Sequence, residues 1–383
     1  MKKRVVYVTS TYFPYGQAYS TRVVAFCKLF KSLGYSTHVI ADYSLDEKKV
    51  SQTDDYSFEI AGDPRRLNRY FVNHRSSYAK LKEHLSRHDV AFVIINANCF
   101  DRFSNVSKLC RSKRIPLLLE ICEWWNFNSL GLGQWDPRSI LFLKHMSTNF
   151  RNVDGVIAIS RLLRDHFSGL GVPTIRVPTI LDTKIYKASE QTNNDRIRLV
   201  FAGSIGGNKE TFKNIMLALH EMEEKSLFDF HIYGANRAQI LRNIGNDRLL
   251  IESVDDVLEI KGKVPQSEIH DALQNADYEI FIRPERRSSH AGFPTKLAES
   301  MVAGTPVITN DTGDIGLYLK TGENGYLLKD SSPGSIKEAL EQVVHLNSKK
   351  IREMRISARK TAEENFDYTA YVQKMRDFIE TVS

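Results

Sequence analysis

The sequence has few cysteines and no long apolar run. A membrane-spanning helix needs ~20 consecutive apolar residues, and no run of that length occurs among the 383 positions. The basic opening 1–4 precedes only a short apolar run, 5–8, and no small-residue cleavage site follows. This predicts a first strand rather than a signal peptide. The cysteines lack metal-ligand spacing, which predicts reduced, packed thiols in a cytosolic protein. They are Cys27, Cys99, Cys110 and Cys122.

The composition is that of a soluble globular chain with an excess of positive charge. Apolar residues make up 42% and charged residues 26% of the sequence, as in ordinary folded proteins. A chain of 383 residues is too long for one ordinary core and suits two domains. The net charge of +7 favours an anionic partner, such as a nucleotide sugar, a phospholipid or a nucleic acid, but does not select among them.

Apolar strands alternate with helical patterns in both halves of the chain. Residues 4–9 predict a buried strand, residues 10–20 a loop that contains Gly16, and residues 21–34 a helix. The second half restarts at 197–202 with another strand, a glycine-rich loop and a helix. This alternation predicts an α/β fold with parallel sheets, which bind ligands at the carboxyl ends of their strands.

Residues 292–308 predict a loop, a short helix and a buried strand. Gly292 permits close approach of the backbone, Pro294 suits the first helical position, and Gly304 is a stop signal. The free amides at the start of such a helix attract an anion such as a diphosphate, and Glu299 could accept hydrogen bonds from sugar hydroxyls. The simpler interpretation is a packing unit of an α/β domain. The buried helix face is expected to hold Leu297, Met301 and Val302.

Two further segments combine residue types suited to binding. The glycine-rich loop 203–209 precedes a helix, so its amides could cradle a phosphate, although ordinary turns also have this composition. Glu123, Trp124 and Trp125 follow a predicted strand at 116–121. Aromatic rings stack on sugars and carboxylates bind their hydroxyls, so this segment is a candidate sugar site. In the alternative interpretation, the tryptophans anchor a loop and Glu123 is solvated.

Together these segments resemble the retaining glycosyltransferases of family 4, which have the GT-B fold. Gly292, Phe293 and Glu299 fall in register with the donor-binding signature of that family, and residues 177–182 resemble its interdomain segment. The resemblance covers nearly the whole chain and is strong over 197–330. It implies an α/β architecture of two facing Rossmann-like domains with a cleft between them.

The resemblance also implies domain boundaries. An N-terminal acceptor-binding domain is expected at 1–183 and a C-terminal nucleotide-sugar-binding domain at 184–365. The C-terminal helix, 366–383, is expected to pack back on the first domain.

The same resemblance assigns the site residues. Glu123 corresponds to a family residue near the reacting carbon. Lys209 corresponds to a lysine that binds the diphosphate, and Glu299 to an acid that binds the donor. These three are the expected catalytic residues. Trp124 and Trp125 are the expected acceptor-binding residues. The expected donor-binding residues are Gly16, Gly203, Ser204, Lys209, Lys213, Tyr233, Gly234, Lys263, Val264, Arg283, Gly292, Phe293, Pro294, Thr295, Lys296, Leu297 and Glu299.

Two positions depart from the family pattern. Ala291 stands where the signature has its first Glu, so another group must make that sugar contact, and His290 and Glu285 are the nearest candidates. Ser204 stands where the family has an Arg that grips the diphosphate, so another cation must replace its charge. The candidate cations are Lys209, Lys213 and Arg283.

The expected function is retaining transfer of a sugar from a UDP- or GDP-linked donor to a hydroxyl of a glycan or lipid-linked glycan. No metal or other cofactor is expected, because no acidic pair lies in a loop suited to bridging Mg²⁺ to a diphosphate. A nucleotide-sugar epimerase on the same fold and a non-catalytic nucleotide-sugar-binding protein remain alternatives. Nucleic acid is not an expected partner, because basic strands with interleaved aromatic residues are absent from the sequence.

Residues 65–87 hold seven Lys or Arg residues and a single acid, Glu83. Such a stretch can bind an anionic membrane surface at about 1 kcal/mol per basic residue. The expected location is therefore cytoplasmic, with peripheral contact to the inner face of the cell membrane. The alternative is a solvated basic helix.

Overall fold

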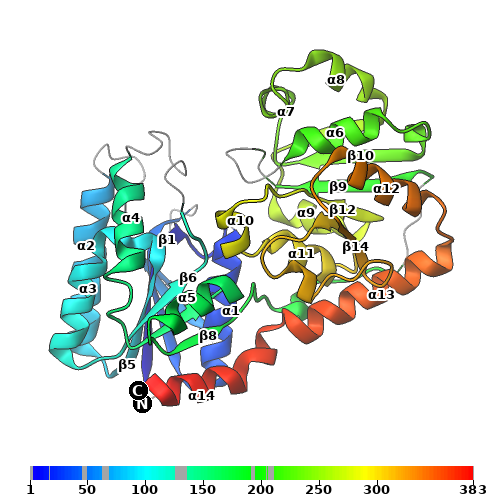
Figure 1. The fold of residues 1–383 in the computed structure, drawn as a ribbon. Coiled ribbons are helices and arrows are strands. Elements are labelled where there is room, and N and C mark those ends of the chain that lie inside the picture. The colour runs from blue at the N-terminus through cyan, green and yellow to red at the C-terminus, as the bar shows by residue number, and fades with distance from the viewer. Residues whose placement is uncertain are drawn as a thin grey trace. The chain divides into compact units, whose positions relative to one another are not determined.

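The computed structural model describes residues 3–16, 18–44, 50–62, 69–125, 136–190, 195–203, 205 and 211–382. The chain divides into two compact units, coloured along the chain in Figure 1. Unit 1 comprises Met1–Leu181 and Asp367–Ser383, and unit 2 comprises Asp182–Phe366. The sequence-based boundaries after 183 and 365 lie close to these limits.

Unit 1 is built on an eight-stranded sheet in the order β3-β4-β2-β1-β5-β6-β7-β8. All neighbouring strands are parallel except β3 and β4, which are antiparallel. The central strands are apolar runs buried on both faces, as expected of parallel strands covered by helices. The strands are β1 (Arg4–Tyr12), β2 (Ser36–Tyr43), β3 (Val50–Gln52), β4 (Tyr56–Ile60), β5 (Val90–Asn96), β6 (Leu117–Ile121), β7 (Gly155–Ala158) and β8 (Thr174–Arg176).

The helices of unit 1 connect these strands. Phe26 and Phe30 of α1 lie in the same apolar cluster as the β1 residues Val5 and Tyr7. The helices are α1 (Ala18–Ser32), α2 (Arg69–Arg87), α3 (Phe100–Lys113), α4 (Pro137–Ser147), α5 (Arg161–Gly169) and α14 (Val372–Val382).

Helix α14 completes the core of unit 1, although it lies at the other end of the sequence. Its Met375, Phe378 and Ile379 are buried in the cluster formed by α1 and the sheet. A Cβ atom at Gly155 in β7 would lie 2.7 Å from Cζ of Phe378 and 2.9 Å from Cγ1 of Val382. Glycine therefore lets the helix approach β7 this closely.

Unit 2 is built on a six-stranded parallel sheet in the order β11-β10-β9-β12-β13-β14. The strands are β9 (Ile197–Ala202), β10 (Phe228–Tyr233), β11 (Leu258–Gly262), β12 (Tyr278–Ile280), β13 (Val307–Asn310) and β14 (Gly325–Leu328). The helices are α6 (Phe212–His220), α7 (Arg237–Asn243), α8 (Arg248–Ser253), α9 (Gln266–Gln274), α10 (Arg287–Ala291), α11 (Thr295–Val302), α12 (Pro333–Val344) and α13 (Ser348–Asn365).

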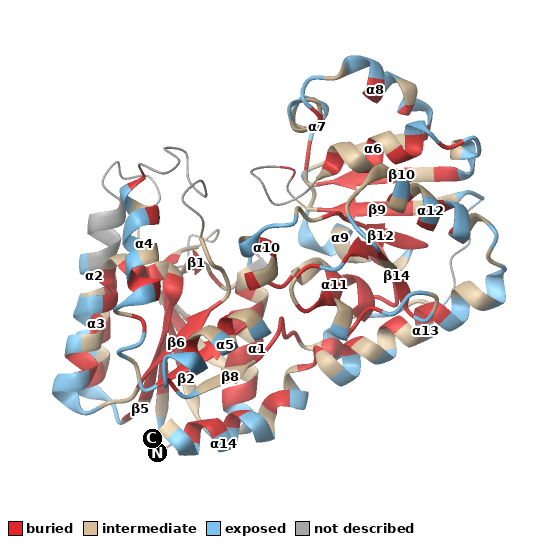
Figure 2. Cartoon of the chain, viewed as in Figure 1, coloured by how far each residue is buried: buried red, intermediate tan, exposed pale blue. Residues whose placement is uncertain are grey.

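Helices cover both faces of the unit 2 sheet. Phe212 of α6 packs on Phe201 and Phe230 from one face, while Leu273 of α9 packs with Val200 on the other. The sheet therefore lies between two helical layers, and Figure 2 shows its central strands as buried. This confirms the predicted α/β fold of two parallel-sheet domains.

Two arginines of α13 fasten residues 183–189 to the body of unit 2. The fully buried Arg355 donates hydrogen bonds to the carbonyls of Ser189, Gln274 and Ala276. Arg359 donates to carbonyls including those of Thr183 and Val302. The Arg355 guanidinium thus links the Ser189 carbonyl to carbonyls at the end of α9. Residues 183–189 are therefore held on the body of unit 2.

Candidate active site

The predicted donor-binding segment, residues 292–299 and called the donor loop below, runs from the end of α10 into the first turns of α11 in unit 2. Pro294 is the N-cap of α11, so the predicted first helical position is wrong by one residue and the helix begins at Thr295. Pro294 still suits this place, because its ring fixes φ at −74°. Leu297, Met301 and Val302 are fully buried, which confirms the predicted apolar face. Gly304 ends the helix with φ at +77°.

Phe293 of the donor loop serves the core. Its side chain is 7% exposed and packs against Tyr318 and Phe366, with ring centroids 5.5 and 5.6 Å away. Leu297 is buried as well. The side chains of these two predicted donor-binding residues therefore face the core and fix the position of the loop.

Lys296 is the cation at the start of α11. Its Nζ lies 3.9 Å from the ring centroid of Phe201 and 5.4 Å from that of Phe281. A Cβ atom at Gly203 would lie 2.7 Å from Cε of Lys296. The lysine is thus held beneath the end of β9 by cation–π contacts.

Gly203 and Gly234 bring the ends of β9 and β10 together. The Gly203 amide donates to the Tyr233 carbonyl over 3.0 Å, and a Cβ atom at Gly234 would lie 2.5 Å from the Gly203 carbonyl oxygen. Both glycines have positive φ, +155° and +92°. Each strand therefore needs glycine where the backbone turns out of the sheet.

Two carboxylates flank Lys296. Burial raises the pKa of Glu299 to about 7, although Lys296 lowers it in part. Glu279 in β12 is fully buried and accepts a hydrogen bond from the Ser300 hydroxyl; burial raises its pKa to about 8. Glu279 was not predicted as a site residue. An acid inside an otherwise apolar strand was the signal that could have identified it.

Arg283 and His290 make side-chain hydrogen bonds beside the donor loop. Arg283 Nη1 donates to Thr312 Oγ1 over 3.2 Å. The Gly313 amide donates to Nδ1 of His290, so the proton of the neutral ring is on Nε2, which lies 3.0 Å from the Glu285 carboxylate. His290 and Glu285, the two candidates for replacing the missing acid, therefore contact each other.

The remaining predicted donor residues are spread over several strand ends. Ala291 is fully buried, so its methyl group faces protein. Lys263 is exposed after β11, Val264 packs near Tyr233, and Lys213 lies in the first turn of α6. Ser204 and the predicted catalytic Lys209 lie outside the described residues.

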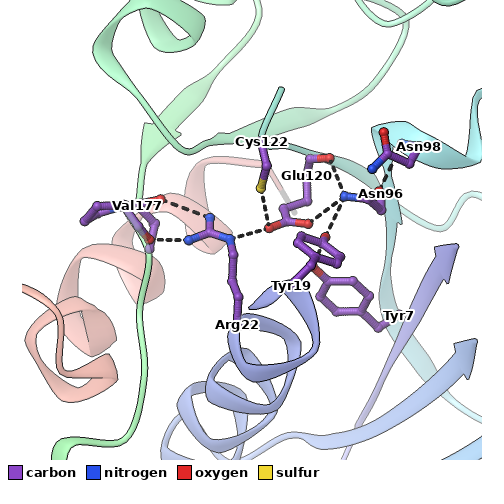
Figure 3. Close-up of polar contacts among 9 residues, drawn as sticks. Tyr7, Tyr19, Arg22, Asn96, Asn98, Glu120, Cys122 and Val177 are labelled. Carbon is purple, nitrogen blue, oxygen red and sulfur yellow. Dashed lines mark hydrogen bonds and ion pairs between the residues drawn. The ribbon is translucent and has the colours of Figure 1, made fainter. Parts of the chain in front are cut away.

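In unit 1, a buried polar network lies between α1 and the carboxyl ends of β5 and β6 (Figure 3). Arg22 Nε donates to Glu120 Oε1 over 2.6 Å, and both side chains are nearly inaccessible. Asn96 Nδ2 donates to the other oxygen of Glu120 over 3.0 Å and to the Tyr19 hydroxyl over 2.6 Å. The Cys122 thiol also donates to Glu120. Glu120 is thus the centre of the network, a role that its sequence position alone did not reveal.

The predicted acceptor segment continues directly from this network. Trp125 Nε1 donates to Glu123 over 3.2 Å, and its ring stacks on Phe142 with centroids 4.7 Å apart. Trp124 packs on His166 at 4.6 Å. The Trp125 contacts match the interpretation of a loop anchor, whereas Glu123 stays partly exposed. Gly16, with φ at +109°, lies between β1 and α1 of the same unit.

Side chains suited to metal binding occur away from the donor loop. One group in unit 1 consists of His38, Glu59 and His84. Lys80 also binds Glu59, and the two histidine rings stack with centroids 3.9 Å apart. Nε2 of both histidines contacts Oε1 of Glu59, and Lys80 binds the other oxygen, so this group is described as a charge cluster.

Residues 182–361 match the family model described as "Glycosyl transferases group 1". This part of the chain is similar to that glycosyltransferase family. It coincides closely with unit 2, which carries the donor loop. A curated relative, the putative colanic acid biosynthesis glycosyltransferase WcaL of Salmonella typhimurium, is 24% identical over 140 residues. That match spans 35% of this chain and only 34% of the relative.

Solved structures resemble the whole chain. Sucrose-phosphate synthase from Thermosynechococcus elongatus has a TM-score of 0.75 at 13% identity, over 100% of this chain and 99% of that one. Anabaena HepE in complex with UDP and glucose has a TM-score of 0.68 at 12% identity, over 99% and 100%. WaaG, a glycosyltransferase involved in lipopolysaccharide biosynthesis, has a TM-score of 0.69 at 13% identity, over 98% and 99%. These neighbours are GT-B glycosyltransferases, and the predicted GT-B fold is confirmed.

Proposed function

We propose that the protein is a retaining glycosyltransferase of family 4 that moves a sugar from a nucleotide-sugar donor to an acceptor hydroxyl during polysaccharide synthesis. Unit 2 binds the donor and unit 1 binds the acceptor. The observation that carries the proposal is the convergence of Gly203, Lys296 and Glu299 at the start of α11, in the domain matched by the glycosyltransferase family. The relatives named for UDP complexes and for colanic acid and lipopolysaccharide biosynthesis support it.

The chemistry that this site must perform is departure of a nucleoside diphosphate. Negative charge grows on the leaving oxygens, so catalysis depends on fixed donors and cations around them. The first amides of α11 and the Lys296 ammonium supply such groups. Lys296 needs little reorganisation for this role, because Phe201 and Phe281 already hold it.

Glu299 is the group proposed to hold the sugar hydroxyls of the donor. Burial raises its pKa to about 7, so near neutral pH it exchanges between a carboxylate and a carboxylic acid. A donor that brings hydroxyl groups stabilises the carboxylate by hydrogen bonding, and donor binding thereby releases the proton. Donor affinity should therefore rise with pH up to about pH 7.

The test of the proposed function uses a panel of UDP- and GDP-sugars with the full chain. Thermal stabilisation by one donor selects it, and nucleoside diphosphate release is then measured with and without glycan or lipid-linked acceptors. Release that requires an acceptor supports transfer. Proton NMR of the initial product reports whether the anomeric configuration is retained; inversion would contradict the retaining mechanism.

A non-catalytic nucleotide-sugar-binding protein is the second candidate, and the burial of Ala291 favours it. No carboxylate is present at that position, and its methyl group faces the protein interior. In the transferase, His290 with Glu285 would have to make the missing sugar contact. Donor binding without turnover for every acceptor in the panel would support the second candidate. If replacing both His290 and Glu285 by alanine leaves turnover unchanged, another group makes the sugar contact.

Membrane contact is a separate part of the proposal. No helix in the described ranges is long and apolar enough to cross a bilayer. On α2, Arg75 and Lys82 are exposed, while Lys80 pairs with Glu59 and Arg87 pairs with Glu83. Arg65 and Arg66 lie outside the described residues. We propose salt-sensitive binding to anionic lipid, tested by flotation with anionic and neutral vesicles. Equal recovery from both would reject it.

A further inference from the structure

Strands β10 and β11, at one edge of the unit 2 sheet, carry a row of charged side chains. Asp229 and His231 are two positions apart in β10 and therefore point to the same face of the sheet. Glu259 of β11 is the register partner of His231, so its side chain lies beside the imidazole. His231 and Glu259 border a cavity of about 460 Å³ that α9 also lines.

His231 is the buried member of this group. Its Nε2 lies 2.9 Å from Asp229 Oδ2 and 2.9 Å from Glu259 Oε2. The side chain is only 8% exposed, yet Nε2 makes no well-directed hydrogen bond to any residue in the described part of the chain. Both oxygens are close to the nitrogen but lie off the direction in which it would donate. A group placed on that axis would be near all three atoms.

The charge around the cavity favours a cation in that place. The lining holds the acids Glu259, Glu268 and Asp271 and the two cations Arg198 and Lys261. Asp229 adds a further negative charge beside His231. Arg198 pairs with Oδ2 of Asp229 over 3.2 Å, so a metal ion would have to displace it. Lys261 binds Oε1 of Glu259, whereas Oε2 faces His231.

We propose that unit 2 binds a divalent transition-metal cation between His231 Nε2, Asp229 Oδ2 and Glu259 Oε2. The three ligand atoms already lie within 4.8 Å of one another. Zinc accepts one imidazole and two carboxylates at ~2.0–2.2 Å, and the adjoining cavity leaves room for water as a further ligand. An imidazole ligand favours Zn²⁺ over Mg²⁺, which prefers oxygen ligands alone.

The site is distinct from the donor loop, so it adds a function that the proposed sugar transfer does not require. A bound ion would cross-link β10 to the edge strand β11. Strand β11 leads into Gly262 and Lys263, and the Gly234 amide donates to the Gly262 carbonyl over 2.6 Å. The ion would therefore stabilise unit 2 where β10 and β11 end.

The experiment is calorimetric titration of the full chain, freed of metal by chelator, with Zn²⁺ and in parallel with Mg²⁺. We expect one Zn²⁺ per chain, a higher melting temperature with Zn²⁺, and no such effect of Mg²⁺. His231→Gln should weaken binding at least about 100-fold, because even residues that only support a metal ligand contribute roughly 10- to 100-fold. Lys261→Met removes a competing cation and should strengthen binding.

Two controls keep the test decisive. His84→Gln alters the unit 1 cluster and should leave the affinity unchanged; loss of binding in this variant would place the ion there and overturn the proposal. Glu259→Gln, at a half-exposed position, replaces His231→Gln if the latter does not fold, and should also weaken binding. Absence of saturable Zn²⁺ binding to the folded wild-type chain, or unchanged affinity in these unit 2 variants, would equally overturn it.

Discussion

Arg22 Nε and Glu120 Oε1 lie 2.6 Å apart, with side chains 2% and 0% exposed. The remaining nitrogens of Arg22 donate to the carbonyls of Val177 and Pro178. One side chain thus joins α1, the end of β6 and the segment that leaves β8. Because the pair is buried, removal of the Arg22 side chain leaves the Glu120 carboxyl group and two carbonyls without their partner.

We therefore expect Arg22→Met to destabilise unit 1 by about 3–5 kcal/mol, the range measured when one member of a buried ion pair is removed. Urea unfolding followed by circular dichroism measures this change. Arg164→Met, which breaks the exposed pair with Asp165, is the matched control and should change stability by less than ~1 kcal/mol. Equal effects of the two variants would contradict the structural role of Arg22.

Glu299→Gln should weaken donor binding roughly 10- to 150-fold, because a hydrogen bond to a charged group contributes about 1.5–3 kcal/mol. The melting temperature without donor should change little. Calorimetry with the donor chosen by the panel measures the affinity. Glu338→Gln, at an exposed position of α12, is the control. Unchanged affinity in Glu299→Gln would leave this acid as an ordinary part of the helix.

The contribution of Glu279 to stability should fall as the pH rises from about 4.5 to about 8. Burial raises the pKa of Glu279 from 4.5 to about 8, so within this window the folded state holds a proton that the unfolded state has lost. Each such acid lowers stability by up to about 1.4 kcal/mol per pH unit. Glu279→Gln keeps a neutral group beside Ser300 and should flatten the profile, whereas Glu338→Gln should not. The same pH dependence in the wild type and in Glu279→Gln would show that the pKa of Glu279 does not change on folding.

Glu123→Ala should lower kcat more than donor affinity, since its proposed partners are the acceptor and the transition state. Trp125→Leu provides the comparison. Trp125 stacks on Phe142 and contacts Phe100, so this variant should lower stability as well as activity. Steady-state kinetics and thermal melts together distinguish the two roles. Full activity of Glu123→Ala would support the interpretation that Glu123 is a solvated loop residue.

Gly155→Ala should destabilise unit 1 by ~1–3 kcal/mol, because the new Cβ atom overlaps Phe378 and Val382. The double variant with Phe378→Leu relieves the contact and should be less destabilised than the sum of the two single variants. Gly169→Ala is the control, since its Cβ would meet no atom within 4 Å. Additive effects would mean that α14 yields to the new methyl group.

The sequence predicted local structure better than distant pairing. The β-branched runs form strands, and the apolar residues at helical spacing after Gly292 form the buried face of α11. Arg22 and Glu120 are 98 positions apart, and their pairing depends on strand order, which periodicity does not encode. Helix α10 was not predicted, because its five residues are too few to show a helical period.

The candidate site was predicted in the same uneven way. The roles of Gly203 and Gly234 were predictable, because a positive φ is a property of the local backbone. The cation–π contacts of Lys296 were not predictable, because Phe201 and Phe281 belong to two other segments of the chain. Trp125 had the composition of a sugar-binding residue, but tertiary packing places its ring against Phe142.

The place of α14 in the core of unit 1 sets an order for synthesis. A ribosome makes the chain from its N-terminus, so all of unit 2 emerges before Met375, Phe378 and Ile379 exist. Until then the strands of unit 1 carry an uncovered apolar face that chaperones can bind. The second domain can therefore complete its folding while the first still waits for its last helix.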